Sequence, residues 1–198
     1  MMARWPSAPD GSRLYVPANA HVTHVPFYST ATGNALLGFL PLPFPSEGAD
    51  AFGIAISPDG GRIYLTTLGP TLWVFDAAAN AALAEVPIPS AIPIPGGVSV
   101  TPDGSKVYVT NPSENTVAVI DAATYAVTKT ITVGSDPIAF GNFIRAAPKF
   151  AGMPGGGNCY GQSIAALTKQ FGGLNAAARN YPTVSALQNE VIAFCGLL

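Results

Sequence analysis

One short motif occurs three times in the sequence, and this repetition constrains the fold more than any other feature. The tripeptide Pro-Asp-Gly lies at residues 9–11, 58–60 and 102–104. Two residues after each glycine, a cation starts a β-forming run: Arg-Leu-Tyr-Val at 13–16, Arg-Ile-Tyr-Leu at 62–65 and Lys-Val-Tyr-Val at 106–109. Proline fixes the first corner of a turn and glycine accepts the positive φ that follows. Each motif therefore predicts a tight turn between two strands, within an array of similar units.

Each unit contains four segments with strand character. In the third unit these are residues 98–101, 106–110, 116–121 and 126–133. The first strand of a unit, such as 52–56, carries no charge and suits an interior, whereas the threonine-rich fourth strand suits an exposed edge. Four antiparallel strands in about 40–50 residues are typical of a β-propeller blade, and a β-sandwich with turn-rich connections is the alternative. The predicted blades cover residues 3–48, 49–96 and 97–136, and a final inner strand is predicted at 137–141.

The third unit also carries a family signature. Residues 108–111 read Tyr-Val-Thr-Asn, and residues 101–133 resemble a near-consensus copy of the repeat of the YVTN family of β-propeller proteins. The resemblance extends over residues 3–144, with a fair match in the second unit (Tyr-Leu-Thr-Thr at 64–67) and a poor match in the first. It implies a bacterial or archaeal extracytoplasmic propeller that acts as a surface or binding protein.

Three blades do not close a ring, because propellers use roughly 4–8 blades. Each terminal blade would expose an apolar sheet face larger than monomers usually tolerate. Two interpretations follow. Either the chain is a fragment of a longer propeller, or copies associate, for instance as two chains that form a six-bladed ring.

The composition changes after residue 144. Residues 145–157 are rich in Gly and Pro and predict a flexible linker, and residues 158–198 predict a small helical module. Helices are expected at 158–171, capped by Asn158 and stopped by glycines at 172–173, and at 183–194. The segment resembles a short C-terminal module of secreted bacterial proteins. The predicted fold class is therefore mainly β, with three four-stranded antiparallel blades of a partial or oligomer-completed β-propeller and a small α-helical C-terminal module.

The only two cysteines, Cys159 and Cys195, bracket this module. A disulfide between them would stabilise so small a unit by roughly 3–4 kcal/mol. Two buried thiols and a metal site are the alternatives, although no further ligands lie at metal-binding spacing. A disulfide implies an oxidising compartment, so we expect a periplasmic, secreted or cell-surface location. The start of the chain, Met-Met-Ala-Arg-Trp-Pro, has no signal-peptide pattern, so either the protein is cytoplasmic or a leader lies upstream.

Charge and hydropathy exclude two classes of partner. The chain has 9 Lys+Arg against 11 Asp+Glu, which is too little positive charge for a nucleic-acid-binding surface. No run of about 20 apolar residues is present, so no membrane-spanning helix is expected. No nucleotide-binding or hydrolase motif occurs, so the sequence predicts no cofactor, no metal and no catalytic residue. His21 and His24 are expected to be ordinary surface residues.

One end of the blades is the predicted ligand-binding surface, because the loops between second and third strands and the blade-to-blade connections emerge there. Polar residues on loops of a rigid scaffold often bind ligands, although such residues can also be merely solvated. The candidate residues are His21, Glu47, Asp50, Asn111, Glu114, Asn115 and Asp136. The aspartates of the Pro-Asp-Gly turns, at the other end, are expected to form turns. The predicted function is an extracytoplasmic binding or scaffold protein for a protein or carbohydrate ligand, and the alternative is part of a propeller hydrolase or lactonase whose catalytic residues lie in other blades.

Overall fold

The computed structural model describes residues 7–17, 23–42, 50–89, 96–139, 143–144, 150–172, 176–177 and 183–196. The chain divides into two compact units, Met1–Ile144 and Arg145–Leu198. Each unit has its own buried hydrophobic residues.

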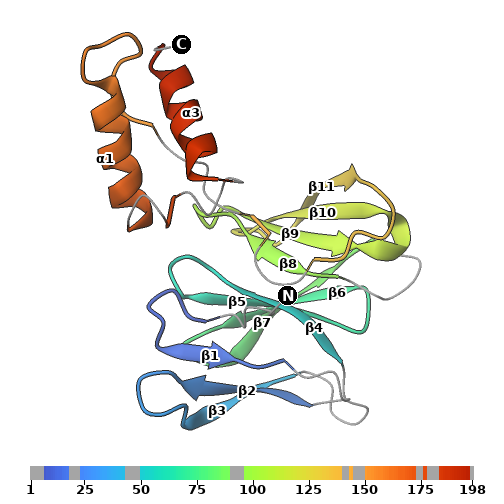
Figure 1. The fold of residues 1–198 in the computed structure, drawn as a ribbon. Helices are drawn as coiled ribbons and strands as arrows, with labels where there is room; N and C mark the ends of the chain where they lie inside the picture. The colour runs from blue at the N-terminus through green and yellow to red at the C-terminus, as the bar shows by residue number, and fades with distance from the viewer. Residues whose placement is uncertain are drawn as a thin grey trace. The chain divides into compact units, whose positions relative to one another are not determined.

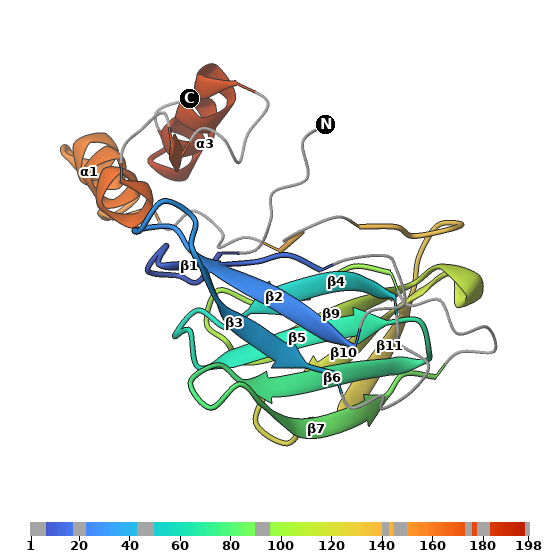
Figure 2. The ribbon, with the colours of Figure 1, turned by 90° about the horizontal axis from the view of Figure 1, so that it is seen from below.

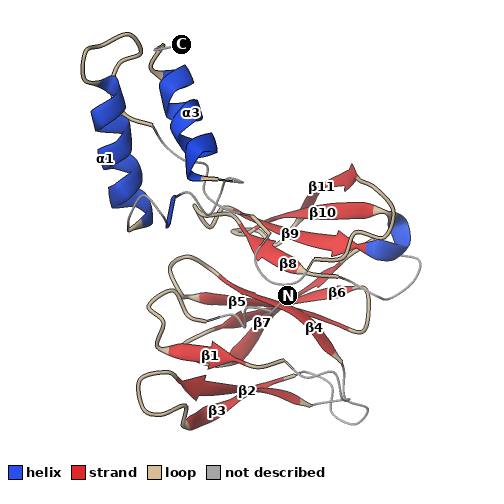
Figure 3. Cartoon of the chain, viewed as in Figure 1, coloured by secondary structure: helices blue, strands red, loops and turns tan. Residues whose placement is uncertain are grey.

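The first unit consists of three antiparallel sheets, in which neighbouring strands are also neighbours in sequence (Figures 1 and 3). The first sheet contains β1 (Arg13–Tyr15), β2 (His24–Ser29) and β3 (Leu36–Pro41). The second contains β4 (Ala51–Ile56), β5 (Arg62–Thr67), β6 (Thr71–Asp76) and β7 (Ala81–Pro87). The third contains β8 (Val98–Val100), β9 (Lys106–Asn111), β10 (Thr116–Asp121) and β11 (Val127–Thr132). This architecture confirms the predicted fold class.

Two strand predictions differ from the structure. The first sheet has three described strands, and only a single bridge between Ser7 and Leu14 occupies its inner position. Prolines at 6 and 9 flank Ser7, and because proline has no backbone N–H, a longer ladder there would lack donors. Residues 137–139 of the predicted final inner strand form no strand, and residues 140–141 lie outside the described residues. Ala139 instead lies against Gly97, where a Cβ atom would come within 2.0 Å of its carbonyl oxygen.

The second sheet lies between the other two and is buried on both sides (Figures 1 and 2). Alternate side chains along a strand point to opposite sides of a sheet, so one strand serves both cores. The core between the first and second sheets contains Tyr15, Val25, Phe27, Leu40, Ile54, Ile63, Leu65, Trp73 and Phe75. The core between the second and third sheets contains Tyr64, Leu72, Val74, Val86, Val98, Val100, Val107, Val109, Ala118 and Ile120. Sheets stacked in this way are successive blades of a partial propeller.

The second unit contains α1 (Cys159–Phe171) and α3 (Val184–Phe194), joined by a disulfide between Cys159 and Cys195. Leu167, Leu187 and Val191 are fully buried between them. Gly172 ends α1 with φ of 73°, and the Thr183 side chain caps α3 by accepting a hydrogen bond from the Ala186 N–H at 3.0 Å. Asn158 precedes α1 as expected, but its side chain makes no capping hydrogen bond.

Residues 150–157, which the sequence predicts as part of a flexible linker, pack against the two helices. Phe150 contacts Phe194, with ring centroids 5.3 Å apart. The backbone of Ala151 exchanges hydrogen bonds with the buried Ser163 hydroxyl, and the Gly155 N–H donates to the Cys195 carbonyl at 2.9 Å. These contacts fix the segment because they pair backbone groups that would otherwise need water.

Candidate functional site

The predicted loop surface lies at one end of the strands in the first unit. Asp50 directly precedes β4, Asn111 ends β9, and Glu114 lies in the short 3-10 helix η1 (Pro112–Glu114). Asn115 follows η1, and Asp136 lies in the turn after β11. Because each of these five residues lies just before or just after a strand, they all lie at the same end of the second and third sheets. His21 and Glu47 lie outside the described residues.

Two of these residues hold loops in place through their side-chain amides. Asn111 is 1 % exposed, and its Nδ2 donates to the Pro89 carbonyl at 2.8 Å. Asn115 has φ of 55°, and its Oδ1 accepts a hydrogen bond from the Asp136 N–H at 2.8 Å. Asp136 has φ of 51°, a conformation that Asp and Asn tolerate better than most residues. The loops of this end are thus connected to one another, while Glu114 and Asp136 remain exposed.

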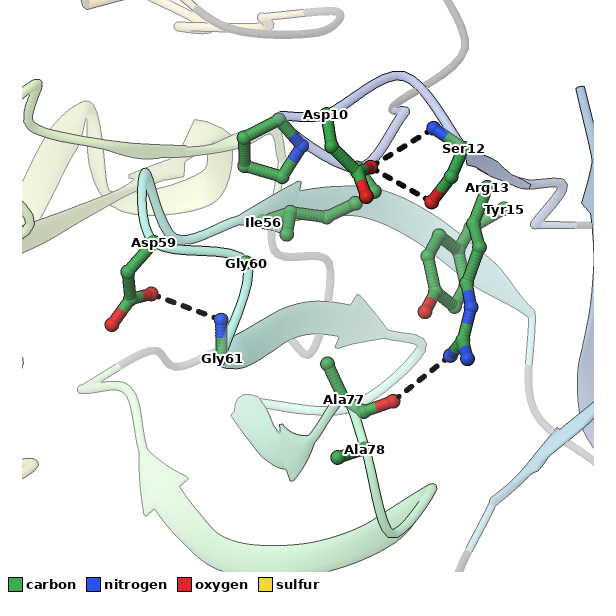
Figure 4. A pocket seen from close by; sticks show the side chains of 12 residues that line it. Asp10, Ser12, Arg13, Tyr15, Ile56, Asp59, Gly60, Gly61, Ala77 and Ala78 are labelled. Carbon is green, nitrogen blue, oxygen red and sulfur yellow. Dashed lines mark hydrogen bonds between the residues drawn. The ribbon is translucent and has the colours of Figure 1, made fainter. Parts of the chain in front are cut away.

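A pocket of about 420 Å³ lies at the opposite end, between the first and second sheets (Figure 4). The Pro-Asp-Gly turns of both sheets line it, together with Arg13 from β1 and the turn after β6. Asp10 accepts hydrogen bonds from the Ser12 N–H and hydroxyl, at 2.9 and 2.8 Å. The Arg13 guanidinium donates to the Ala77 carbonyl at 3.2 Å. The sequence indicated the turns and the cations, but it did not predict the pocket, which requires two turns 49 residues apart to lie side by side.

The aspartates at this end are held as carboxylates by local hydrogen bonds. The Ser12 backbone N–H and then its hydroxyl lower the pKa of Asp10, and the Ser57 hydroxyl and then the Gly61 N–H lower the pKa of Asp59. The Thr101 hydroxyl, followed by the Ser105 N–H and hydroxyl, lowers the pKa of Asp103 to about 2. This bonding matches their expected role as turn formers.

These shifts predict that acid weakens the first unit. A carboxyl group whose pKa is lower in the folded than in the unfolded state stabilises the fold above its unfolded pKa, near 3.8, and this contribution is lost as the pH falls through the folded pKa. For Asp103 the loss falls between about pH 4 and pH 2. We expect Asp103→Asn to lower the melting temperature at pH 7, and the difference from the native chain to disappear near pH 2. Thermal melts at several pH values measure this, and a difference that is constant with pH would contradict it.

The cations after the turns connect neighbouring sheets. Arg13 of the first sheet reaches Ala77 of the second, and Arg62 of the second sheet donates from its Nε to the Tyr125 hydroxyl of the third at 3.3 Å. Arg62 also forms an ion pair with Asp76 at 3.1 Å. Both groups are partly exposed, so the pair itself contributes little to stability.

Over the described ranges, no three His, Cys, Asp or Glu side chains gather in a way that could hold a metal ion. His24 is exposed at the start of β2, and its ring makes an edge contact with Phe39, with centroids 4.4 Å apart. None of the described helices combines the length and the apolar character needed to cross a lipid bilayer.

Comparison with known proteins identifies the fold. No protein-family model matches the sequence, and no curated protein does either. Many solved structures are similar to this chain, among them three that match about two thirds of it. They are Kuenenia stuttgartiensis hydrazine synthase (22 % identity, TM-score 0.59, 67 % of this chain), and U3-55K and the WD40 repeats of RRP9 (each 19 %, 0.56, 66 %). The match spans only 36–38 % of those chains. At these identities the likeness shows a propeller fold and nothing further about function.

Proposed function

We propose that this chain is part of an extracytoplasmic β-propeller that binds a protein or carbohydrate ligand through one end of its sheets. This end, called the loop end, carries Asp50, Asn111, Glu114, Asn115 and Asp136. The propeller region is residues 3–144, and residues 158–198 form an attached helical module. The Tyr-Val-Thr-Asn sequence at 108–111 and the repeated Pro-Asp-Gly turns support an assignment to the YVTN family. The propeller fold of the similar structures supports a scaffold role.

The hydrogen bonds between the loops carry this proposal. The Asn111 side chain connects η1 to the segment that leaves β7, and the Asn115 side chain connects η1 to the turn after β11. Loops fixed in this way lose little conformational entropy when a ligand binds. The exposed carboxylates of Glu114 and Asp136 lie on these fixed loops. They favour a ligand that offers cationic groups or hydrogen-bond donors.

The disulfide in the helical unit supports an extracytoplasmic location, because such bonds persist mainly in oxidising compartments. This part of the proposal is tested separately from ligand binding. Fractionation of the native host with an antibody to the chain should recover it outside the cytoplasm. A thiol assay on the recovered, denatured protein should find no free thiol.

Ligand selection followed by mutagenesis tests the binding role. The chain is presented to a glycan array and to a random-peptide display library, and the selected ligands are measured against two loop-end variants, Glu114→Ala and Asp136→Asn. Asn is chosen at 136 because it tolerates the positive φ there. We expect these variants to weaken binding by about tenfold or more, as central contacts of an interface do.

A matched control is Thr130→Ala on the exposed outer strand β11, which should leave binding unchanged. Ligands that bind the loop-end variants as well as the native chain would contradict the proposal. Metal-dependent turnover of a lactone by the full-length product would favour the hydrolase alternative, whose catalytic residues lie in other blades.

A further inference from the structure

We propose that the uncovered side of the first sheet binds the third sheet of a second copy of this chain, so that two chains close one six-sheet ring. The inference concerns the sides of the sheets, and it does not depend on the ligand-binding role of the loop end. It rests on a comparison of equivalent positions in the three sheets.

The first sheet has an apolar side that no other sheet of the described residues covers. In the second sheet, Ile63, Trp73 and Phe75 face the preceding sheet and are 0–8 % exposed. The equivalent residues of the first sheet, Leu14, Pro26 and Tyr28, are only half-buried. The strand register places Phe39 opposite Pro26 and Leu36 opposite Tyr28, and these two side chains are 48 % and 50 % exposed. These five residues are called the open side of the first sheet: Leu14, Pro26, Tyr28, Leu36 and Phe39.

The third sheet carries the matching surface. Tyr15 and Tyr64 each lie two residues after the cation that follows a Pro-Asp-Gly turn. Both side chains pack against the following sheet and are 1 % and 2 % exposed. Tyr108 is the equivalent residue of the third sheet, after which the described residues form no further sheet, and it is half-buried. Val117, at the position equivalent to the fully buried Leu72, is also half-buried. Tyr108 and Val117 are thus partly accessible on the side that covers a following sheet in the other two cases, whereas Val119, equivalent to Val74, is already buried at 4 % exposure.

The inner strand of the third sheet, β8, already has neighbours at the position where the inner strand of a following sheet would lie. These neighbours are Ala139 and Ile144. A Cβ atom at Gly53 of β4 would come within 3.2 Å of Gly96, just before β8. A Cβ atom at the equivalent Gly97 would meet Ala139, and the Ile144 N–H donates to the Ser99 hydroxyl at 3.1 Å. The innermost position beside the third sheet is thus occupied, and the first sheet offers the three strands that lie further out.

The Pro-Asp-Gly turns of successive sheets pack against one another, and the first and last turns of this series each have an exposed side. The ring of Pro9 lies against Gly60, and the ring of Pro58 lies against Gly104; a Cβ atom on either glycine would be 3.5 Å from the proline Cδ. In the first turn, Gly11 has nothing within 4 Å of its Cβ position, and in the third turn Pro102 is exposed. A third sheet docked on the open side would place a proline on Gly11 in the same way.

The cations that follow the Pro-Asp-Gly turns show the same relation between one sheet and the next. Arg13 and Arg62 each reach the turn after the third strand of the following sheet. Lys106 is the equivalent cation of the third sheet, and it is exposed. In the proposed assembly it reaches the exposed turn at residues 30–34 of the second copy. Two copies then bring two identical contacts and six sheets, a number within the range of roughly 4–8 at which propellers close.

The oligomeric state of the full chain tests this proposal. We expect light scattering after size exclusion, at about 10–100 μM protein, to give twice the mass of one chain. Phe39→Glu should raise the dimer dissociation constant by about tenfold or more, since it places a charge in an apolar contact. Lys106→Glu and Tyr108→Ser should weaken the dimer from the other side. Circular dichroism and melting temperature establish that each variant is folded.

Leu83→Glu is the matched control, because Leu83 is 47 % exposed on the outer strand of the middle sheet. It should leave the dimer intact. A monomer at every concentration would overturn the proposal, as would an equal effect of Leu83→Glu. A dimer that is weakened by Phe39→Glu but by neither third-sheet variant would also overturn it, because the first sheets would then contact each other.

Discussion

Breaking the Cys159–Cys195 disulfide is expected to unfold the second unit of the chain. The bond joins residues 36 apart in sequence, and a loop of that size stabilises a protein by about 3–4 kcal/mol through restriction of the unfolded chain. Both cysteines are buried, at 2 % and 1 % exposure, in the same cluster as Leu167, Leu187 and Val191. Removing a native disulfide from a small domain typically costs about 2–5 kcal/mol and often abolishes folding at about 37 °C. The core of so small a unit rarely supplies more than about 3–5 kcal/mol, so it offers little to offset that loss.

The double variant Cys159→Ser, Cys195→Ser tests this without a reducing agent. Helical circular dichroism at 222 nm should fall, and proteolysis should begin between residues 150 and 196, while the β signal of the first unit is retained. The native chain treated with a reducing agent should behave like the variant, and the variant should not respond to that agent. A helical signal that survives in both samples would contradict the prediction.

The repeated turns made the sheets predictable. Because Pro-Asp-Gly marks the connection between first and second strands, the sequence gives the register of each unit, and β4 and β11 begin and end within a residue of the predicted 52–56 and 126–133. The apolar first strands and the threonine-rich fourth strand also indicated which edge is buried. Local turn chemistry and periodicity of two are enough for this level of structure.

Contacts between units of the repeat were less predictable. The reach of Arg13 to the Ala77 carbonyl depends on how two sheets stack, and no local pattern encodes that distance. Asn111 was predicted as a ligand-facing residue, yet its amide binds the Pro89 carbonyl, a partner 22 residues away. The packing of residues 150–157 was missed because a Gly- and Pro-rich composition predicts flexibility, whereas the Ser163 hydroxyl and the Cys195 carbonyl hold this segment.

Phe75→Ala is expected to destabilise the first unit by about 3–5 kcal/mol, the cost of truncating a buried phenylalanine. Phe75 lies on β6 in the core between the first and second sheets and is 0 % exposed. Its neighbours belong to two stacked sheets whose backbones are fixed by hydrogen-bonded ladders, so they cannot easily move to fill the cavity. Urea unfolding followed by tryptophan fluorescence measures the change in the free energy of unfolding.

Phe52→Ala provides the comparison within the same sheet. Phe52 lies on β4, at the inner edge of the sheet, and is 38 % exposed, so its truncation should cost about 1 kcal/mol or less. Both variants replace phenylalanine by alanine in a strand of the same sheet, so the intrinsic strand preference of the residue affects them alike. The difference between their changes in unfolding free energy therefore reports the packing between the first and second sheets. If Phe75→Ala cost no more than Phe52→Ala, the two sheets would not share a close-packed core, and the stacking of blades would have to be abandoned.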